Sequence, residues 1–383
     1  MKRATPSKAP RKRRWPRAVL VGVGGVVIAL GVVAMAASPG PIEERIARSP
    51  AWDGNKFVNT VPTTMSMNGQ GGSIAWRFLF ERNDREPSTP LPTVTVDLET
   101  LSGPDPEGVR ATWMGHSSVF LEVDGVRVLT DPVWGDRASP VGFAGPRRFH
   151  PPPVALEALP LPDVVLISHD HYDHLDEATI RVLARRGARF IVPLGVGAHL
   201  RTWGVAAQRV QELDWWQQTT IADGRLTLVA TPARHFSGRG LLDRNRTLWA
   251  SWVLLGNRHR VYFGGDSGLF DGFSEIGTTY GPFDLTLLEI GAYDPAWGSV
   301  HMGPEGALEA HRRLRGKVLL PIHWGTFNLG LHPWYEPPEQ LLEAARRGGD
   351  RVAFPRLGET LTLDGDVPKA PWWRAVRTAA QDS

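Results

Sequence analysis

Cysteine is absent from this 383-residue chain, and the absence narrows the chemistry open to it. No disulfide bond can form, so the fold is not stabilised by disulfides. The redox compartment of the protein therefore cannot be inferred from its cysteine usage. Any transition-metal site must use histidine and carboxylate ligands, because no thiolate is present. Zinc accepts such nitrogen and oxygen donors, and so do iron and manganese.

Acidic residues are missing from the first 17 positions, which hold eight of the 43 lysines and arginines. Without this basic tail (residues 1–17), 35 basic side chains stand against 40 acidic ones, a formal net charge of −5. The sequence pI of about 9.3 therefore reflects the tail. Because the body lacks bulk positive charge, we expect no nucleic-acid partner.

Charge of either sign is missing from residues 18–37, the apolar stretch that follows the tail. A helix of this length spans about 30 Å, the thickness of the hydrocarbon core of a bilayer. This predicts a transmembrane anchor, although Ala34-Met35-Ala36 also fits a cleavage site, which leaves a cleaved signal open. Either way, the body is expected on the periplasmic side of a bacterial inner membrane, or secreted.

The body divides by composition. Residues 38–106 are rich in proline, glycine, asparagine and threonine, which predicts an extended arm that wraps the next part of the chain. From 107 to 365, β-like runs and helical segments intermix, with hairpin signals such as Asp124-Gly125. This pattern predicts one α/β domain in which helices cover the outer faces of two sheets. We expect residues 366–383 to form a C-terminal tail.

Apolar runs and their boundaries define the expected elements within this domain. Helices are predicted where acids or proline begin a periodic segment and glycine follows its end, as Gly187 and Gly316 do. The predicted strands are 109–114, 119–123, 126–130, 163–168, 189–192, 226–230, 248–254, 260–263, 285–290 and 317–321, and the predicted helices are 176–186, 304–315 and 339–347.

Histidine and aspartate cluster directly after the apolar run 163–168. The motif HxHxDH at 169–174 presents three imidazoles and one carboxylate, from His169, His171, Asp173 and His174. A single catalytic zinc keeps one position open for water, so four candidate ligands within six residues indicate two ions. The alternative, a solvated polar loop, fits poorly with such a density of metal-ligand types.

Two metals need further ligands, and these are expected at other strand ends. His235, Asp266 and His323 each follow an apolar β-like run, and Asp266 stands in Gly264-Gly265-Asp266, where glycines permit close backbone approach. A structural histidine is the alternative for His235 and His323, and a turn residue is the alternative for Asp266. The repeated order of strand and then ligand type favours the metal site.

These residues resemble the metal motif of the metallo-β-lactamase superfamily. The resemblance implies a four-layer αββα sandwich and a hydrolase with two Zn²⁺ per chain. It implies that one zinc is held by His169, His171 and His235 and the other by Asp173, His174 and His323. Asp266 would bridge the two ions and hold the attacking hydroxide between them.

Shorter motifs are similar to the N-acyl-phosphatidylethanolamine phospholipase D branch: TWMGHSS at 112–118, LTDP at 129–132, RASP at 137–140, GPRRF at 145–149, ELDWW at 212–216 and HWGTF at 323–327. This similarity implies a phosphodiesterase acting on N-acylated phospholipids. Gly298-Ser299-Val300 departs from the branch, which leaves the lipid preference open. A lactonase or other ester hydrolase of the same fold is the alternative. A non-enzymatic membrane-tethered protein is disfavoured by the complete ligand set.

Five further residues are candidates for supporting roles. Asp131 is expected to fix a ligand imidazole by a hydrogen bond, although a turn residue would also fit its position. The resemblance implies that His301 lies on the substrate side, where it could protonate the leaving group, and that His311 lies near the substrate; without it, His311 fits a helix surface. Tyr172 lies within the HxHxDH motif and is a candidate substrate contact, although it could equally turn away. His116 could orient a loop near the metals or cap a turn. A homodimer is left open.

Overall fold

The computed structural model describes residues 44–63, 76–77, 83–103 and 108–379. Within these ranges the strands form a seven-stranded sheet, in the order β13-β1-β2-β3-β4-β5-β6, and a six-stranded sheet, in the order β12-β11-β10-β9-β8-β7. The strands are β1 Val109–Gly115, β2 Ser118–Val123, β3 Val126–Thr130, β4 Val164–Leu166, β5 Phe190–Pro193, β6 Val210–Leu213, β7 Gln218–Ile221, β8 Leu226–Thr231, β9 Ser251–Leu255, β10 Arg260–Phe263, β11 Phe283–Glu289, β12 Gly316–Ile322 and β13 Thr360–Thr362.

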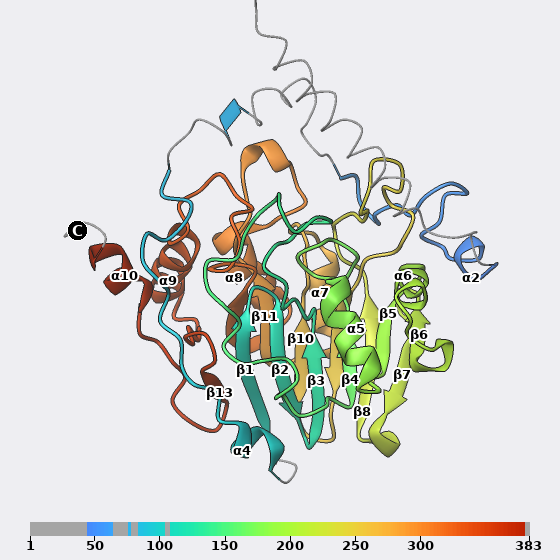
Figure 1. The fold of residues 1–383 in the computed structure, drawn as a ribbon, viewed down its shortest axis with the longest axis horizontal. Helices are drawn as coiled ribbons and strands as arrows, with labels where there is room; N and C mark the ends of the chain where they lie inside the picture. The colour runs from blue at the N-terminus through green and yellow to red at the C-terminus, as the bar shows by residue number, and fades with distance from the viewer. Residues whose placement is uncertain (1–43, 64–75, 78–82, 104–107, 380–383) are drawn as a thin grey trace, which may run out of the picture.

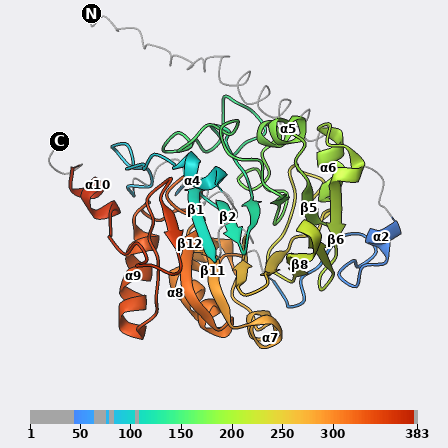
Figure 2. The same cartoon turned by 90° about the horizontal axis from the view of Figure 1, so that it is seen from below.

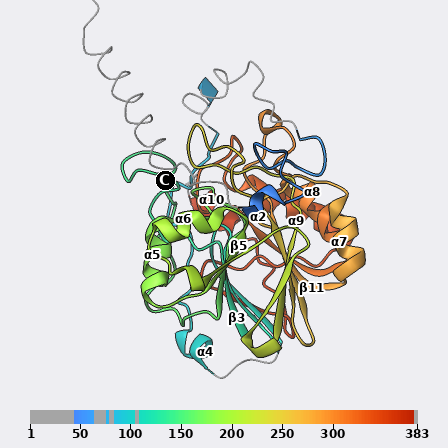
Figure 3. The same ribbon diagram turned by 90° about the vertical axis from the view of Figure 1, so that its right-hand side faces the viewer.

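Helices cover both outer faces of the paired sheets (Figures 1, 2 and 3). The α-helices are α2 Glu44–Ala47, α4 Leu98–Ser102, α5 Glu177–Arg185, α6 Val196–Thr202, α7 Gly272–Tyr280, α8 Gly303–Arg313, α9 Glu336–Gly348 and α10 Trp373–Ala379. Helices α5 and α6 lie on the seven-stranded sheet, whereas α7, α8 and α9 lie on the other (Figure 2). The predicted two-sheet α/β sandwich is therefore confirmed.

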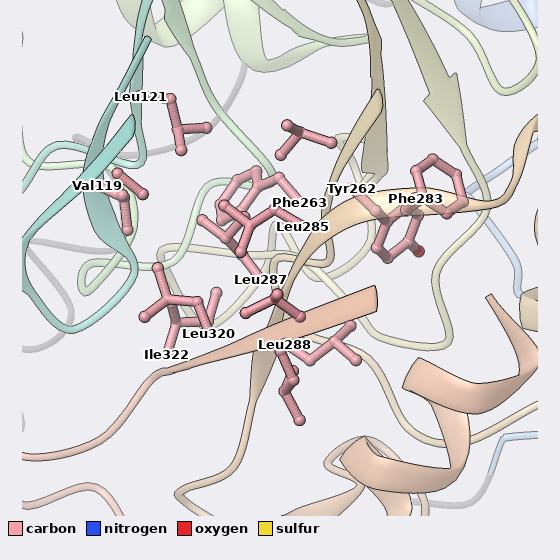
Figure 4. Packing of buried hydrophobic residues seen from close by; sticks show 14 of the residues in the cluster. Val119, Leu121, Tyr262, Phe263, Phe283, Leu285, Leu287, Leu288, Leu320 and Ile322 are labelled. Atoms are coloured by element: carbon pink, nitrogen blue, oxygen red, sulfur yellow. The ribbon is translucent and has the colours of Figure 1, made fainter. Parts of the chain in front are cut away.

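Apolar side chains that alternate between the two faces of a strand contribute to two layers of the core. In β2, Val119 and Leu121 belong to the hydrophobic cluster between the sheets, whereas Phe120 belongs to the cluster beneath α5 and α6. Successive side chains of a strand point to opposite faces, so one apolar strand serves two layers. Figure 4 shows Val119 and Leu121 gathered with Leu285 and Leu287 of β11 in the layer between the sheets.

Every predicted strand and helix of the domain corresponds to an observed element. The bounds of β3 and β10 match the prediction, and the other elements have ends shifted by one or more residues. Within the predicted strand 163–168, only β4 (Val164–Leu166) pairs in the sheet. Within the predicted strand 248–254, pairing begins at Ser251, the first residue of β9. Several elements escaped prediction: β6, β7, β13, α6, α7 and α10. Strands β6 and β7 read VQEL and QTTI, and α7 contains two glycines, so their patterns are short or weakly apolar.

The basic tail (1–17) and the apolar stretch 18–37 lie outside the described residues. Among the described residues, no helix is long and apolar enough to cross a bilayer. The described parts of the predicted arm contain α2 and α4, and isolated bridges pair Trp52 with Phe57 and Thr93 with Leu357.

Candidate metal centre

Strand direction brings the predicted ligands to one edge of the sandwich. Strands β3 and β4 are parallel neighbours, β10, β11 and β12 form a second parallel set, and β8 runs with β10 because both are antiparallel to β9. The loops after β4, β8, β10 and β12 carry the HxHxDH motif, His235, Asp266 and His323. This edge lies opposite α4 (Figure 1).

Two groups of donor atoms surround one carboxylate oxygen, Oδ2 of Asp266. His169 Nε2 and His235 Nε2 lie 3.9 and 3.7 Å from it, and His171 Nδ1 lies 2.8 and 3.3 Å from those two nitrogens. On the other side, His174 Nε2 and His323 Nε2 lie 3.2 and 3.1 Å from the same oxygen. Asp173 Oδ2 completes the second group, 3.4 Å from His174 and 3.2 Å from His323.

These separations fit two cations. Ligands that hold a zinc tetrahedrally at about 2.0–2.2 Å stand about 3.3–3.6 Å apart, close to the spacing within both groups. Buried His174 Nε2 and Asp266 Oδ1 have no hydrogen-bond partner, which is costly for polar atoms away from water. The structure thus brings together all seven predicted ligands, in the two sets that the family resemblance implies.

Electrostatics show what the donors do without a cation. Burial opposes the charge on Asp266, but the positive charges of His174 and then His323 outweigh it and hold the carboxyl pKa well below its usual range. Conversely, burial acts to lower the pKa of His323, but Asp266 and Asp173 raise it to about 10. The pKa of His174 is likewise raised well above normal. These two imidazoles therefore carry protons at neutral pH, which a metal must displace.

Asp131 orients one of the ligand imidazoles through a hydrogen bond. Its Oδ2 accepts hydrogen bonds from His174 Nδ1 at 2.7 Å and Ser168 Oγ at 2.5 Å, and its Oδ1 accepts one from the Ser168 backbone at 2.7 Å. The carboxyl is completely buried, and burial raises its pKa. Asp131, His116 and His323 all have positive φ, a strained conformation that clusters at functional sites.

Glu289 and His116 also lie beside the donor groups. Glu289 was not predicted from the sequence, whereas His116 had been left open between a role near the metals and a turn cap. Glu289 ends β11 and accepts a hydrogen bond from His301 Nδ1 at 2.5 Å. His116 Nε2 lies 3.0 Å from Asp173 Oδ2, and burial, followed by the charge of His323, lowers the pKa of His116 to about 3. Glu289 obeys the rule of an apolar strand followed by a ligand type, so that signal was available.

Two predicted substrate residues lie elsewhere. The hydroxyl of Tyr172 donates to the Arg239 carbonyl at 2.7 Å, and the Arg239 guanidinium lies 4.0 Å from the centroid of its ring. His311 is a buried residue of α8, and its Nδ1 pairs with Thr286 Oγ1 of β11 at 2.7 Å. Neither residue lines the cavity above the donor groups, so the structure does not bring them to the centre.

That cavity has a volume of about 530 Å³, and its floor includes His171, Asp173, Asp266, His301 and His323. Its walls are largely apolar and come from Phe236, Leu241, Ala292, Trp297 and Leu329, with Arg244 as the cationic wall residue. Such a space suits a ligand with a polar head and an apolar body.

Comparisons with known proteins agree with this geometry. A sequence model of the beta-lactamase superfamily domain matches residues 126–324. An uncharacterised protein of Mycobacterium tuberculosis is 47% identical over 362 residues, covering 93% of this chain and 94% of the relative. An N-acyl-phosphatidylethanolamine-hydrolyzing phospholipase D of Caenorhabditis elegans is 42% identical over 247 residues, covering 62% and 69%.

Among solved structures, Igni18, a metallo hydrolase from the archaeon Ignicoccus hospitalis, is similar with a TM-score of 0.51 and 27% identity. The match covers 66% of this chain and 97% of Igni18. The extent of the family match, the two-sheet sandwich and the clustered metal-ligand residues lead to one assignment. The chain belongs to the beta-lactamase superfamily and is a metal-dependent hydrolase of the metallo-β-lactamase fold.

Proposed function

We propose that this hydrolase is a two-zinc phosphodiesterase that cleaves N-acylated phosphatidylethanolamine-like lipids in the manner of a phospholipase D. The observation that carries the proposal is the pair of donor groups sharing Asp266 Oδ2, at the floor of a cavity with apolar walls. Two cations suit a phosphodiester and apolar walls suit acyl chains. The lipid-hydrolysing relative of C. elegans adds support.

Different residues at the cavity would bind the phosphate and supply a proton to the leaving group. Two divalent cations, when bound, would lower the pKa of water toward neutrality and polarise a phosphoryl oxygen. His301 faces the cavity, and Glu289 holds its Nδ1, which leaves Nε2 for the substrate. Burial acts to lower the pKa of His301, but the Glu289 charge raises it, so His301 can donate a proton to the leaving alkoxide. Arg244 would attract the phosphate.

A lipid panel tests the proposal. The zinc-loaded full-length protein is incubated with N-acylphosphatidylethanolamine, phosphatidylcholine and an acyl lactone, and products are identified by mass spectrometry. We expect phosphatidic acid and N-acylethanolamine from the first substrate. Turnover of the lactone without turnover of either phospholipid would overturn the proposal and favour the ester-hydrolase alternative, since the same centre can act on a carbonyl.

Asp131→Asn should weaken metal binding by about 10–100-fold, the usual effect of changing the partner that orients a ligand. Both Asp131 oxygens accept hydrogen bonds, so the amide nitrogen would face a donor in either orientation, His174 Nδ1–H or the Ser168 backbone N–H, and the contact that orients the imidazole would be weakened. Zinc affinity is measured by competition with a chromophoric chelator. Asp163→Asn is the matched control, because Asp163 precedes β4 at its other end and accepts a backbone hydrogen bond from Arg127. Equal affinities for the two variants would contradict the role given to Asp131.

We also propose that residues 18–37 anchor the protein in a bacterial inner membrane with the hydrolase on the periplasmic side. The charge-free length of this segment and the basic tail before it support the proposal. An anchor of this kind would keep the enzyme at the surface where its phospholipid substrate is found.

A further inference from the structure

Two adjacent leucines stand exposed at the mouth of the cavity. Leu241 and Leu242 are 72% and 83% exposed, and Leu241 also lines the cavity. They lie at the tip of residues 238–244, which we call the rim loop. Exposed apolar side chains grouped beside a binding cavity mark an interaction surface rather than scattered surface residues.

The rim loop is a structured turn that holds these leucines outward. Asp243 accepts backbone hydrogen bonds from Arg239 at 3.0 Å and Gly240 at 2.8 Å. Arg239 is nearly buried, and its guanidinium donates to the carbonyls of Asp170 at 2.7 Å and Leu175 at 2.8 Å. Because the base of the loop is tied to the ligand loop, its tip holds a defined position relative to the donor atoms.

The surface between the rim loop and the metal-ligand residues combines an apolar wall with positive charge, and this combination suits a lipid. Phe236, Leu241, Trp297 and Leu329 form an apolar wall that leads from the rim loop to the metal-ligand residues. Arg244 and Arg246 follow the leucines and bring positive charge, whereas Asp243, the acid that follows Leu242 in the sequence, is buried in the turn. Leucines flanked by arginines match an interface of acyl chains and anionic headgroups.

The N-terminal segment joins the body beside the same loop. The Asn55 carbonyl accepts a hydrogen bond from Arg246 at 2.6 Å, Phe57 N donates to the Asn245 carbonyl at 2.8 Å, and Asn59 Nδ2 donates to the His235 carbonyl at 2.7 Å. In Figure 1 the blue segment 44–63 runs near the yellow loops at the end of the sandwich opposite α4. The apolar stretch 18–37 precedes this segment in the sequence, and the seven-residue step from position 37 to position 44 can span at most about 25 Å.

We propose that the rim loop docks on a lipid bilayer, with Leu241 and Leu242 inserted among the acyl chains and the cavity mouth held against the membrane. A lipid could then present its phosphodiester to the centre while its chains pass along the apolar wall. Docking itself does not depend on catalysis, whereas delivery of a lipid substrate rests on the proposed function.

The absence of cysteine permits a direct test. Leu242→Cys in the full-length chain carries a single spin label, and its accessibility to oxygen and to a polar nickel reagent is measured on vesicles of phosphatidylethanolamine and phosphatidylglycerol. Glu99→Cys is the control, because Glu99 is exposed on α4 at the opposite end of the sandwich. We expect membrane depth for the label at 242 and water for the label at 99. Equal water exposure at both sites would overturn the proposal.

A second experiment separates membrane docking from catalytic activity. Leu242→Asp should reduce turnover of vesicle-borne phospholipid by about tenfold, since the charge opposes insertion of the tip. It should leave turnover of a soluble short-chain phosphodiester unchanged, and Leu242→Phe should restore the vesicle rate. If the label inserts but no phospholipid is hydrolysed, docking stands and the proposed function falls. Shielding of the label without vesicles that grows with protein concentration would indicate a second copy of the chain and overturn the proposal.

Discussion

Asp266→Asn is expected to remove most of the bound metal and to reduce kcat by at least about 10³-fold. The Oδ2 atom of Asp266 is common to both donor groups, lying 3.1 Å from His323 Nε2 and 3.7 Å from His235 Nε2. Asparagine keeps the shape of the side chain but loses the charge that attracts both cations. Metal content is measured by mass spectrometry and kcat by release of the lipid headgroup.

The matched control for this variant is Asp271→Asn, five residues further along the chain. The Asp271 side chain is fully exposed and contacts Arg313, away from the cavity. It should keep two metals per chain and the wild-type rate. Full metal content and a rate within about threefold of wild type for Asp266→Asn would show that this carboxylate is not the bridge.

Removing metal with a chelator at pH 8 is expected to lower the Tm by roughly 5–10 °C. A ligand that binds only the folded state at about a thousand times its Kd stabilises that state by about 4 kcal/mol, which sets the size of the shift. Without metal, burial disfavours the negative charges of Asp173 and Asp266, and neighbouring imidazoles such as His174 and His323 must offset this cost. Differential scanning fluorimetry of loaded and stripped protein measures the difference.

This difference should shrink as the pH falls from 8 to 6. The pKa of His323 is raised to about 10 and that of His174 lies well above its usual value, so both imidazoles are protonated in the stripped protein throughout this range. Each proton that metal must displace weakens apparent binding by about tenfold per pH unit. Metal stabilisation is therefore greatest at high pH and is lost toward low pH. A Tm difference that widens on acidification would contradict this assignment, and Asp266→Asn should show almost none.

The sequence predicted more of the centre than of its surroundings. Each ligand type followed an apolar β-like run, so His235, Asp266 and His323 could be grouped with the HxHxDH motif from the sequence alone. Asp131 was placed beside a ligand imidazole for the same reason, as the residue that follows β3. Glu289 was missed because an acid closing an apolar strand was counted as part of the strand.

Substrate residues were predicted less well because side-chain direction is not a local property. Tyr172 lies within the ligand loop, yet its hydroxyl turns to the Arg239 carbonyl. His311 follows His301 by ten residues, yet α8 directs it toward Thr286 in the middle of β11. Proximity in sequence to a ligand did not bring either residue to the cavity.

The amino-acid sequence alone determined which ligands this protein can offer a metal: nitrogen and oxygen donors without thiolates, each following a β-like run of one α/β domain. Tertiary structure decided which carboxylate oxygen both sets share, that Glu289 holds His301, and that an apolar wall with two exposed leucines stands over the centre. The physical reason is that strand periodicity and ligand type are local, whereas contacts between distant loops depend on strand order and crossover, which no short pattern specifies.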